Sequence, residues 1–111
     1  MMRACFPALS FVLLTLVASP AFAADAATGY TIAKENCARC HNVEKGGGFK
    51  QRPPTFQAIA IYRTQDDIWG RIISPSPHSG MPDVSWTLTP DNVQDVVAYI
   101  VSLDRPVSLP E

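Results

Sequence analysis

The chain has 111 residues, of which 9 are basic and 10 are acidic, and its formal net charge is −1. This length predicts one small domain, and the near balance of charge argues against nucleic-acid binding. The charges are unevenly placed, because residues 34–63 contain six basic and two acidic side chains, whereas residues 64–111 contain two basic and seven acidic ones. The basic region could steer an acidic partner, or it could be an ordinary solvated surface.

Residues 1–23 have the pattern of a secretory signal peptide. Arg3 supplies a basic start, residues 8–18 form an apolar run, and Ala21-Phe22-Ala23 fits the small-x-small cleavage rule. The run is shorter than the roughly 18 residues that a membrane span needs. We therefore predict cleavage rather than anchoring, loss of Cys5 with the signal, and a periplasmic mature domain of residues 24–111 that is not inserted in the membrane.

The first predicted helix begins near Ala26, where Tyr30, Ala33 and Cys37 recur at helical spacing. It is expected to run into the segment Cys37-Ala38-Arg39-Cys40-His41, and the glycines at 46–48 are expected to stop it.

This segment has the pattern of a c-type haem attachment site. Cys37 and Cys40 are three residues apart, so their sulfurs share one face of a turn and can reach the two vinyl groups of one porphyrin. His41 would then ligate the iron. A Cys-x-x-Cys pair is also found in thioredoxin-like proteins and in zinc sites. A zinc site would need two more ligands, but the remaining cysteine and histidine are Cys5 and His78 alone.

Two short helices are predicted in the middle of the chain. Residues 45–54 contain three glycines and Pro53-Pro54, and they predict a loop around the haem edge. Thr55 is the expected N-cap of a helix to about Tyr62, and Thr64 of a second helix to Ile73. Apolar side chains are expected to face the core from both helices: Phe56, Ile59, Ala60, Ile68, Trp69, Ile72 and Ile73.

The segment 74–82 is rich in proline and predicts an irregular loop that carries the second iron ligand. Met81 is the candidate, because flanking glycine and proline can fix its thioether, a soft ligand that raises the potential of the iron. The alternative role for Met81 is core packing. His78 competes for the same coordination position, and a second imidazole would give a lower potential.

Thr89-Pro90 predicts the start of the last helix, an N-cap followed by proline at the first helical position. This helix is expected to reach about Leu103 before Pro106 ends it, with five residues facing the core: Val93, Val96, Val97, Ile100 and Val101. Nothing after residue 23 alternates with period two, so the predicted fold is all-α, with three to five short helices and long loops around one covalently bound haem.

Over essentially the whole mature chain, and most specifically in the attachment motif and Met81-Pro82, the sequence resembles the monohaem class I c-type cytochromes. In that family, a glycine and an aromatic residue of the first helix pack against an aromatic residue of the last, positions that Gly29, Tyr30 and Tyr99 fit. Pro54-Thr55-Phe56 fits the family's Pro-x-Phe, whose proline carbonyl accepts a hydrogen bond from the axial histidine. Pro53 stands where the family usually has glycine. Trp69 and Trp86 could contact the haem or be plain packing residues.

The resemblance implies a one-electron carrier rather than an enzyme, with one haem c on Cys37 and Cys40 and with His41 and Met81 as axial ligands. Its expected partners are proteins that dock transiently: a dehydrogenase or quinol-oxidising donor and an oxidase, reductase or photosynthetic acceptor. A monomer is expected. Two alternatives remain at this point, a tightly bound electron-entry subunit of a larger oxidoreductase and a small haem peroxidase. The peroxidase would need an open sixth coordination position on the iron.

Overall fold

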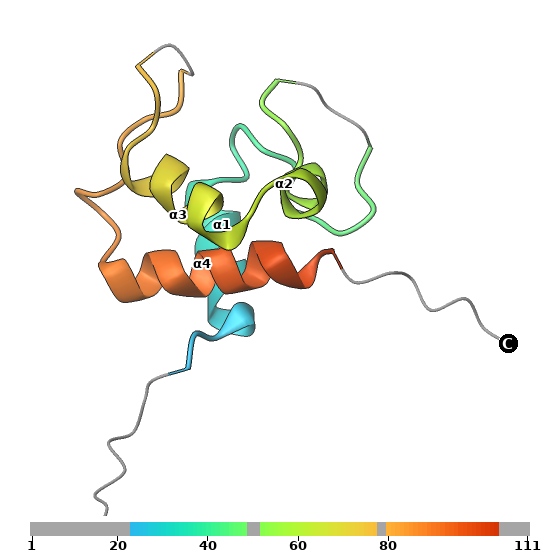
Figure 1. Ribbon diagram of the computed structural model, residues 1–111, viewed down its shortest axis with the longest axis horizontal. Coiled ribbons are helices and arrows are strands. Elements are labelled where there is room, and N and C mark those ends of the chain that lie inside the picture. Colours follow the sequence, from blue (N-terminus) through green and yellow to red (C-terminus); the bar gives the residue numbers. More distant parts are fainter. Residues whose placement is uncertain (1–22, 49–51, 78–79, 105–111) are drawn as a thin grey trace, which may run out of the picture.

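The computed structural model describes residues 23–48, 52–77 and 80–104, and their regular elements are four helices (Figure 1). These are α1 (Ala26–Asn36), α2 (Phe56–Tyr62), α3 (Gln65–Ile73) and α4 (Pro90–Ser102). The predicted all-α class is confirmed. The predicted signal peptide, apart from Ala23, lies outside the described residues. Within the described residues, no helix has the length and apolar character that crossing a membrane requires.

Helix α1 begins at a cap that also joins it to the last helix. The Asp25 side chain accepts a hydrogen bond from the Ala27 N–H at 2.9 Å, while the Asp25 N–H donates to Asp95 Oδ1 of α4 at 2.7 Å. The helix ends at Asn36, with Cys37 as its C-cap. The prediction that the glycines at 46–48 stop this helix is therefore wrong, because the chain leaves the helical path at the haem motif, nine residues before the first of them.

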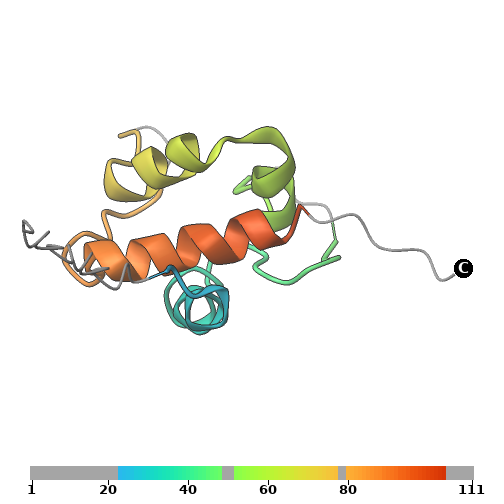
Figure 2. The ribbon, with the colours of Figure 1, turned by 60° about the horizontal axis from the view of Figure 1, so that its bottom comes forward.

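The packing of α1 against α4 is the most extensive helix contact in the described part of the chain. Figure 2 shows α1 nearly end-on on one side of α4, with α2 and α3 on the other side. At the crossing, Gly29 lies so close to α4 that a Cβ there would overlap the backbone of Asp95 and Val96. The rings of Tyr30 and Tyr99 pack beside it, with centroids 5.2 Å apart. The helix contact implied by the resemblance is present.

We predict that Gly29→Ala strongly destabilises the protein, because the added methyl must push two backbones apart. The expected loss is about 2 kcal/mol or more of unfolding free energy, at the upper end for overpacking. Gly70→Ala in α3 is the matched control, since a Cβ at Gly70 meets nothing within 4 Å. That variant should gain about 0.5–1 kcal/mol from helix propensity. Denaturant unfolding monitored by circular dichroism would measure both, and equal effects would contradict the prediction.

Helices α2 and α3 begin at the predicted N-caps. Thr55 Oγ1 accepts from the Ala58 N–H at 3.1 Å, and Thr64 Oγ1 accepts from the Asp67 N–H at 3.2 Å. In α3, Ile68 and Ile72 are buried one turn apart, and Trp69 is half-buried. Ile73 was expected to face the core, but it is 42% exposed, because it lies at the helix end, about 100° around the axis from Ile72.

Helix α4 begins with the predicted cap, a reciprocal pair of hydrogen bonds between Thr89 and Asn92. Its inward face differs from the predicted five residues at two positions. Val101 is 41% exposed, and Tyr99, which was not among the five, is buried. Ile100 is buried in the core, and Val101, the next residue along the helix, points towards solvent. The predicted terminator, Pro106, lies outside the described residues.

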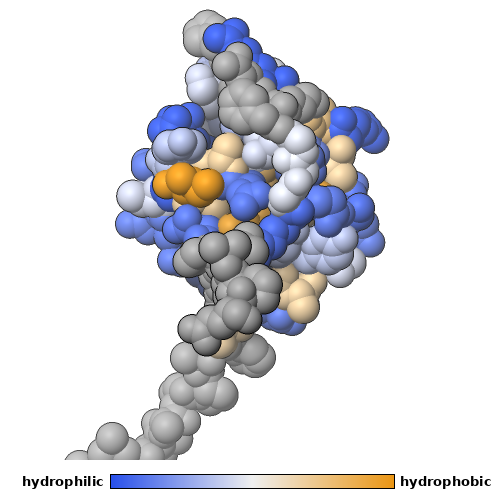
Figure 3. Space-filling view, turned by 90° about the vertical axis from the view of Figure 1, so that its right-hand side faces the viewer, coloured by the Kyte–Doolittle hydropathy of each residue, from blue (hydrophilic) through white to orange (hydrophobic). Residues whose placement is uncertain are grey.

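The buried side chains form one core at the meeting point of the four helices. Its members are Ala33, Val43, Phe56, Ala60, Ile68, Ile72, Val93, Val96, Val97, Tyr99, Ile100 and Leu103. The surface over α2 and the C-terminal end of α4 is mainly hydrophilic, with a small group of apolar residues (Figure 3). The core is small for a folded domain, so a large apolar group bound against it would add much of the buried surface.

Candidate haem-binding site

The attachment motif forms a hydrogen-bonded turn directly after α1. The Cys37 N–H donates to the Ala33 carbonyl at 2.8 Å, which makes Cys37 part of the helix end. The N–H groups of Cys40 and His41 then both donate to the Cys37 carbonyl, at 3.1 and 2.9 Å. Cys37 is half-buried and packs against the core, and burial raises the pKa of its thiol. A raised pKa differs from the lowered pKa of reactive Cys-x-x-Cys thiols in redox enzymes.

The ring of His41 is oriented by a backbone carbonyl on the far side of the following loop. Its Nδ1 lies 2.7 Å from the Pro54 carbonyl oxygen. A carbonyl only accepts hydrogen bonds, so Nδ1 must carry the proton, and in the neutral ring the lone pair is then on Nε2. This is the tautomer that a metal-ligating histidine needs, and the hydrogen bond is the one that the resemblance implies.

The two residues after His41 are also held by distant parts of the chain. The Asn42 carbonyl accepts from the Phe56 N–H at 3.0 Å, and the Val43 carbonyl accepts from the buried Tyr99 hydroxyl at 2.6 Å. Phe56 also packs on the His41 ring, with centroids 5.4 Å apart. The segment that carries the histidine is thus fixed to the start of α2 and to α4.

Sequence reasoning identified Phe56 and Tyr99 as packing residues but missed these contacts with the histidine segment. The Pro-x-Phe pattern was a usable signal for Phe56. No signal pointed to the bond between Tyr99 and Val43, because the two residues are 56 positions apart.

An exposed ionic cluster connects α1 to the same segment. The Glu44 carboxylate accepts from Lys34 Nζ at 2.8 Å and from the Tyr30 hydroxyl at 3.0 Å. Lys34 and then Tyr30 lower the pKa of Glu44, so its contribution to stability is present above its unfolded pKa and is lost as the pH falls through the folded one. Because Lys34 is paired, it contributes less to the predicted basic region than an isolated lysine would.

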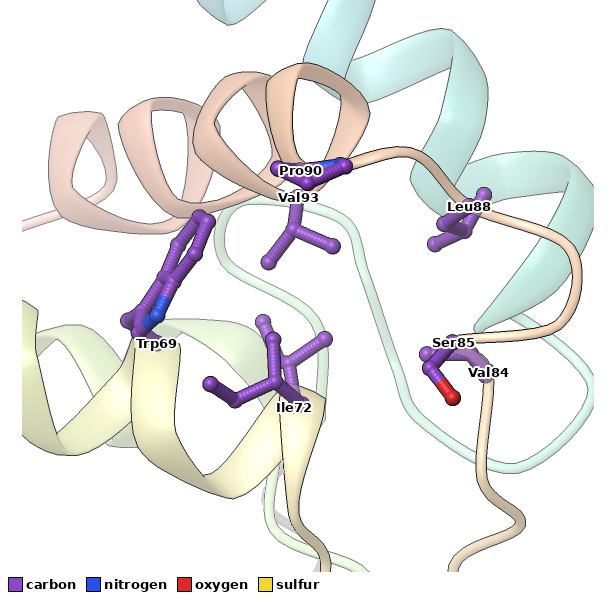
Figure 4. A pocket seen from close by; sticks show the side chains of 8 residues that line it. Trp69, Ile72, Val84, Ser85, Leu88, Pro90 and Val93 are labelled. Atoms are coloured by element: carbon purple, nitrogen blue, oxygen red, sulfur yellow. The ribbon is translucent and has the colours of Figure 1, made fainter.

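The remaining predicted site residues lie on α3 and on the loop before α4. Met81 is half-buried and packs against the same core as Cys37, next to Gly80, whose φ is +69°. Trp69 projects from α3 into a cavity of about 230 Å³ that is bounded by Leu88 and Val93 (Figure 4). His78, the competing ligand, lies outside the described residues.

The chemistry of these donors fits a covalently bound haem. Two thiols share one turn, an adjacent imidazole has its Nε2 lone pair available, and a thioether packs against the same apolar core. A zinc site is not supported, because the described residues hold no group of three or more His, Cys, Asp or Glu side chains that could bind a metal. A thioredoxin-like site would need strands, and the elements of the described segments are all helices.

Comparison with known proteins agrees with this chemistry. The family model described as cytochrome c oxidase, cbb3-type, subunit III, matches residues 24–100. The chain belongs to the cytochrome c family. The match covers α1, the attachment motif, α2, α3 and most of α4, and it confirms the resemblance to monohaem class I c-type cytochromes.

Two curated c-type cytochromes are also similar to this cytochrome. Cytochrome c2 of Pararhodospirillum photometricum is 43% identical over 53 residues, which are 48% of this chain and 45% of that protein. Cytochrome c6 of Thermosynechococcus vestitus is 31% identical over 96 residues, which are 85% of this chain and 84% of that protein. The chain thus spans less than half of the first relative and most of the second. No solved structure matches this cytochrome.

Proposed function

We propose that this cytochrome is a one-electron carrier with a single haem c, bound by Cys37 and Cys40 and ligated by His41 and Met81. The haem, when bound, supplies the redox chemistry by alternating between ferrous and ferric iron. Family membership and the names of the two relatives support electron transfer rather than catalysis. The observation that carries the proposal is the hydrogen bond from His41 to Pro54, because it fixes the ring and its tautomer next to the two thiols.

The residues of the chain would contribute rigidity and an apolar environment. The segment 41–43 is held at three consecutive positions by Pro54, Phe56 and Tyr99, so its imidazole can change little in position between redox states. The core from α3 and α4 would exclude water from one side of the haem, with Trp69 in the haem environment. A site that rearranges little and stays dry suits fast electron transfer.

We place the mature protein, residues 24–111, in the periplasm as a monomer. There it would take electrons from a dehydrogenase or a quinol-oxidising complex and deliver them to an oxidase, a reductase or a photosynthetic acceptor. One observation favours a second role: the matching family model is described as an oxidase subunit. As a tightly bound electron-entry subunit, the protein would purify with its partner; as a free carrier, it would purify alone.

Optical spectroscopy of the exported protein, combined with a redox titration, tests the proposal. We expect the spectrum of a six-coordinate c-type haem, one reversible one-electron transition, and poor binding of carbon monoxide by the reduced protein at neutral pH. A peroxidase would instead have an open coordination position and would bind carbon monoxide readily. A colourless protein, or one whose iron accepts carbon monoxide freely, would overturn the carrier role.

A further inference from the structure

A hollow beside the start of α1 is lined by carboxylates from two parts of the chain. It has a volume of about 230 Å³, and we call it the acidic hollow; the residues that line it are Ala23, Ala24, Asp25, Asp91, Gln94 and Asp95. The Asp25 N–H donates to Asp95 Oδ1 at 2.7 Å, so the chain that enters α1 is bound directly to α4. The 11 residues of α1 separate the hollow from the haem motif by about 16 Å.

The carboxylates of the acidic hollow have local roles but no basic partner. Asp25 caps α1, and Asp91 lies in the first turn of α4, where the helix dipole favours negative charge. Within the described residues, no ion pair involves any of the three aspartates, and residues 80–104 contain no lysine, arginine or histidine. Hydrogen bonds, first from the Thr28 side chain and then from the Ala27 backbone, lower the pKa of Asp25, so it is charged at neutral pH.

The chain itself can supply the missing cation. A metal ion does not suit the hollow, because the described residues hold no group of three or more His, Cys, Asp or Glu side chains that could bind one. Ala23 and Ala24, which line the hollow, are the two residues between which cleavage of the signal peptide is predicted. Hydrolysis of this peptide bond consumes one water, leaves a carboxylate on the released peptide and leaves an α-ammonium group on Ala24.

This ammonium group would lie close to the carboxylates. Successive backbone nitrogens are at most about 3.6 Å apart, and the Asp25 nitrogen is 2.7 Å from Asp95 Oδ1, so the Ala24 nitrogen lies within about 6 Å of that oxygen. At this separation an opposite charge favours the charged form of an ionisable group. The dipole of α1 opposes the ammonium, but it amounts to about half a positive charge, against three carboxylates.

We propose that the acidic hollow binds the α-ammonium group of Ala24, so that removal of the signal peptide creates an ion pair between the mature N-terminus and α4. The inference rests on the proposed mature protein, which begins at Ala24. In the precursor the same nitrogen is an uncharged amide, and the carboxylates repel one another without a cation. Maturation therefore strengthens the contact between α1 and α4, the most extensive helix contact in the described part of the chain.

A basic side chain of a partner protein fits the acidic hollow less well. The terminus of the chain is already held there by its covalent bond to Asp25, whereas a partner would lose translational and rotational freedom on binding.

The ion pair predicts how stability depends on pH. The charged groups that line the hollow are Asp25 at the cap of α1 and Asp91 and Asp95 on α4, and all three would raise the pKa of the Ala24 amine. A group whose pKa is raised in the folded state stabilises the fold fully below its unfolded pKa, and this contribution is lost as the pH rises through the folded pKa. The added stability is expected at neutral pH and should disappear in alkaline solution.

The test determines the pKa of the Ala24 amine in the exported holoprotein. Trace acetylation with acetic anhydride between about pH 6 and 10, followed by mass spectrometry of the N-terminal peptide, reports the unprotonated fraction, and the expected pKa lies above the ordinary value for a chain terminus, about 7.7–8.0. Asp95→Asn removes the charge but keeps an oxygen that can accept the Asp25 N–H. It should lower the pKa towards the ordinary value and speed acetylation at neutral pH about two- to fivefold.

Asp104→Asn is the matched control, because it makes the same change of charge at an exposed residue beyond the other end of α4. It should leave the pKa of the Ala24 amine and its acetylation rate unchanged.

A second variant separates the ion pair from other effects of Asp95. Insertion of Gly-Ser-Gly between Ala23 and Ala24 keeps the cleavage signal but displaces the terminal ammonium from the hollow. In the protein of native length, Asp95→Asn should lower the midpoint of thermal unfolding by about 2–5 °C at neutral pH. In the lengthened protein, the same substitution should cause no such loss, because no cation remains to be lost.

The proposal is wrong if the Ala24 amine of the wild type titrates as an ordinary terminus, if Asp104→Asn lowers its pKa as much as Asp95→Asn does, or if Asp95→Asn lowers the unfolding midpoint equally in both lengths. Failure of the proposed maturation looks different. The mass of the exported protein would then place its N-terminus at a residue other than Ala24, and the ion pair would be overturned together with the predicted cleavage site.

Discussion

Replacing Met81 with alanine is expected to lower the reduction potential of the holoprotein and to abolish the weak long-wavelength absorption band between sulfur and ferric iron. A thioether stabilises ferrous iron, so its loss should shift the potential by at least about 0.1 V, within the roughly 0.8 V over which axial ligands tune haem. The reduced variant should also bind carbon monoxide, because its sixth coordination position is open. Redox titration and optical spectra measure all three effects.

His78→Ala is the matched control for this experiment, since His78 lies three residues before Met81 and is the competing ligand in the sequence. It should leave the potential, the sulfur band and the carbon monoxide response as they are in the wild type. The reverse result, with His78→Ala altering the spectrum and Met81→Ala leaving it unchanged, would assign the sixth ligand to histidine and predict a lower native potential.

The double variant Cys37→Ala, Cys40→Ala is expected to lose covalent haem and most of its helical structure. The core of the described residues consists of twelve side chains, most of them from four short helices, and the longest helix, α4, has 13 residues. Helices this short are marginal in water unless packing supports them. Without the haem, the chain would bury too little apolar surface to offset its conformational entropy. Far-ultraviolet circular dichroism measures the loss.

Cys5→Ala is the control for the double variant, because Cys5 lies in the predicted signal peptide and should be absent from the mature protein. Its mature product should be indistinguishable from the wild type in mass, colour and helicity. If the double variant kept native helicity and unfolded cooperatively, the helices would be stable by themselves, and the structural role assigned to the haem would be wrong.

Interactions between residues close in sequence made the helix starts and the haem motif predictable from the sequence alone. The helix starts at Thr55, Thr64 and Thr89 were predictable, because each threonine satisfies N–H groups within three residues of itself. The haem motif was also predictable from local spacing, because this spacing places the two thiols and the imidazole on one turn. The resemblance to c-type cytochromes added the long-range pairs, from Gly29 and Tyr30 to Tyr99 and from His41 to Pro54, which spacing alone does not reveal.

The tertiary structure decided what depends on contacts between distant segments. Apolar periodicity could not show that Ile73 and Val101 face solvent, because the width of a buried face is set by the neighbouring helix. It also gave no sign that Tyr99 binds the Val43 carbonyl and so helps to fix the histidine segment. Trp86 was considered as a haem contact or a packing residue, and the structure speaks against packing, because its turn is anchored by Val84 and Leu88 and the indole is 88% exposed. The haem contact stays a prediction.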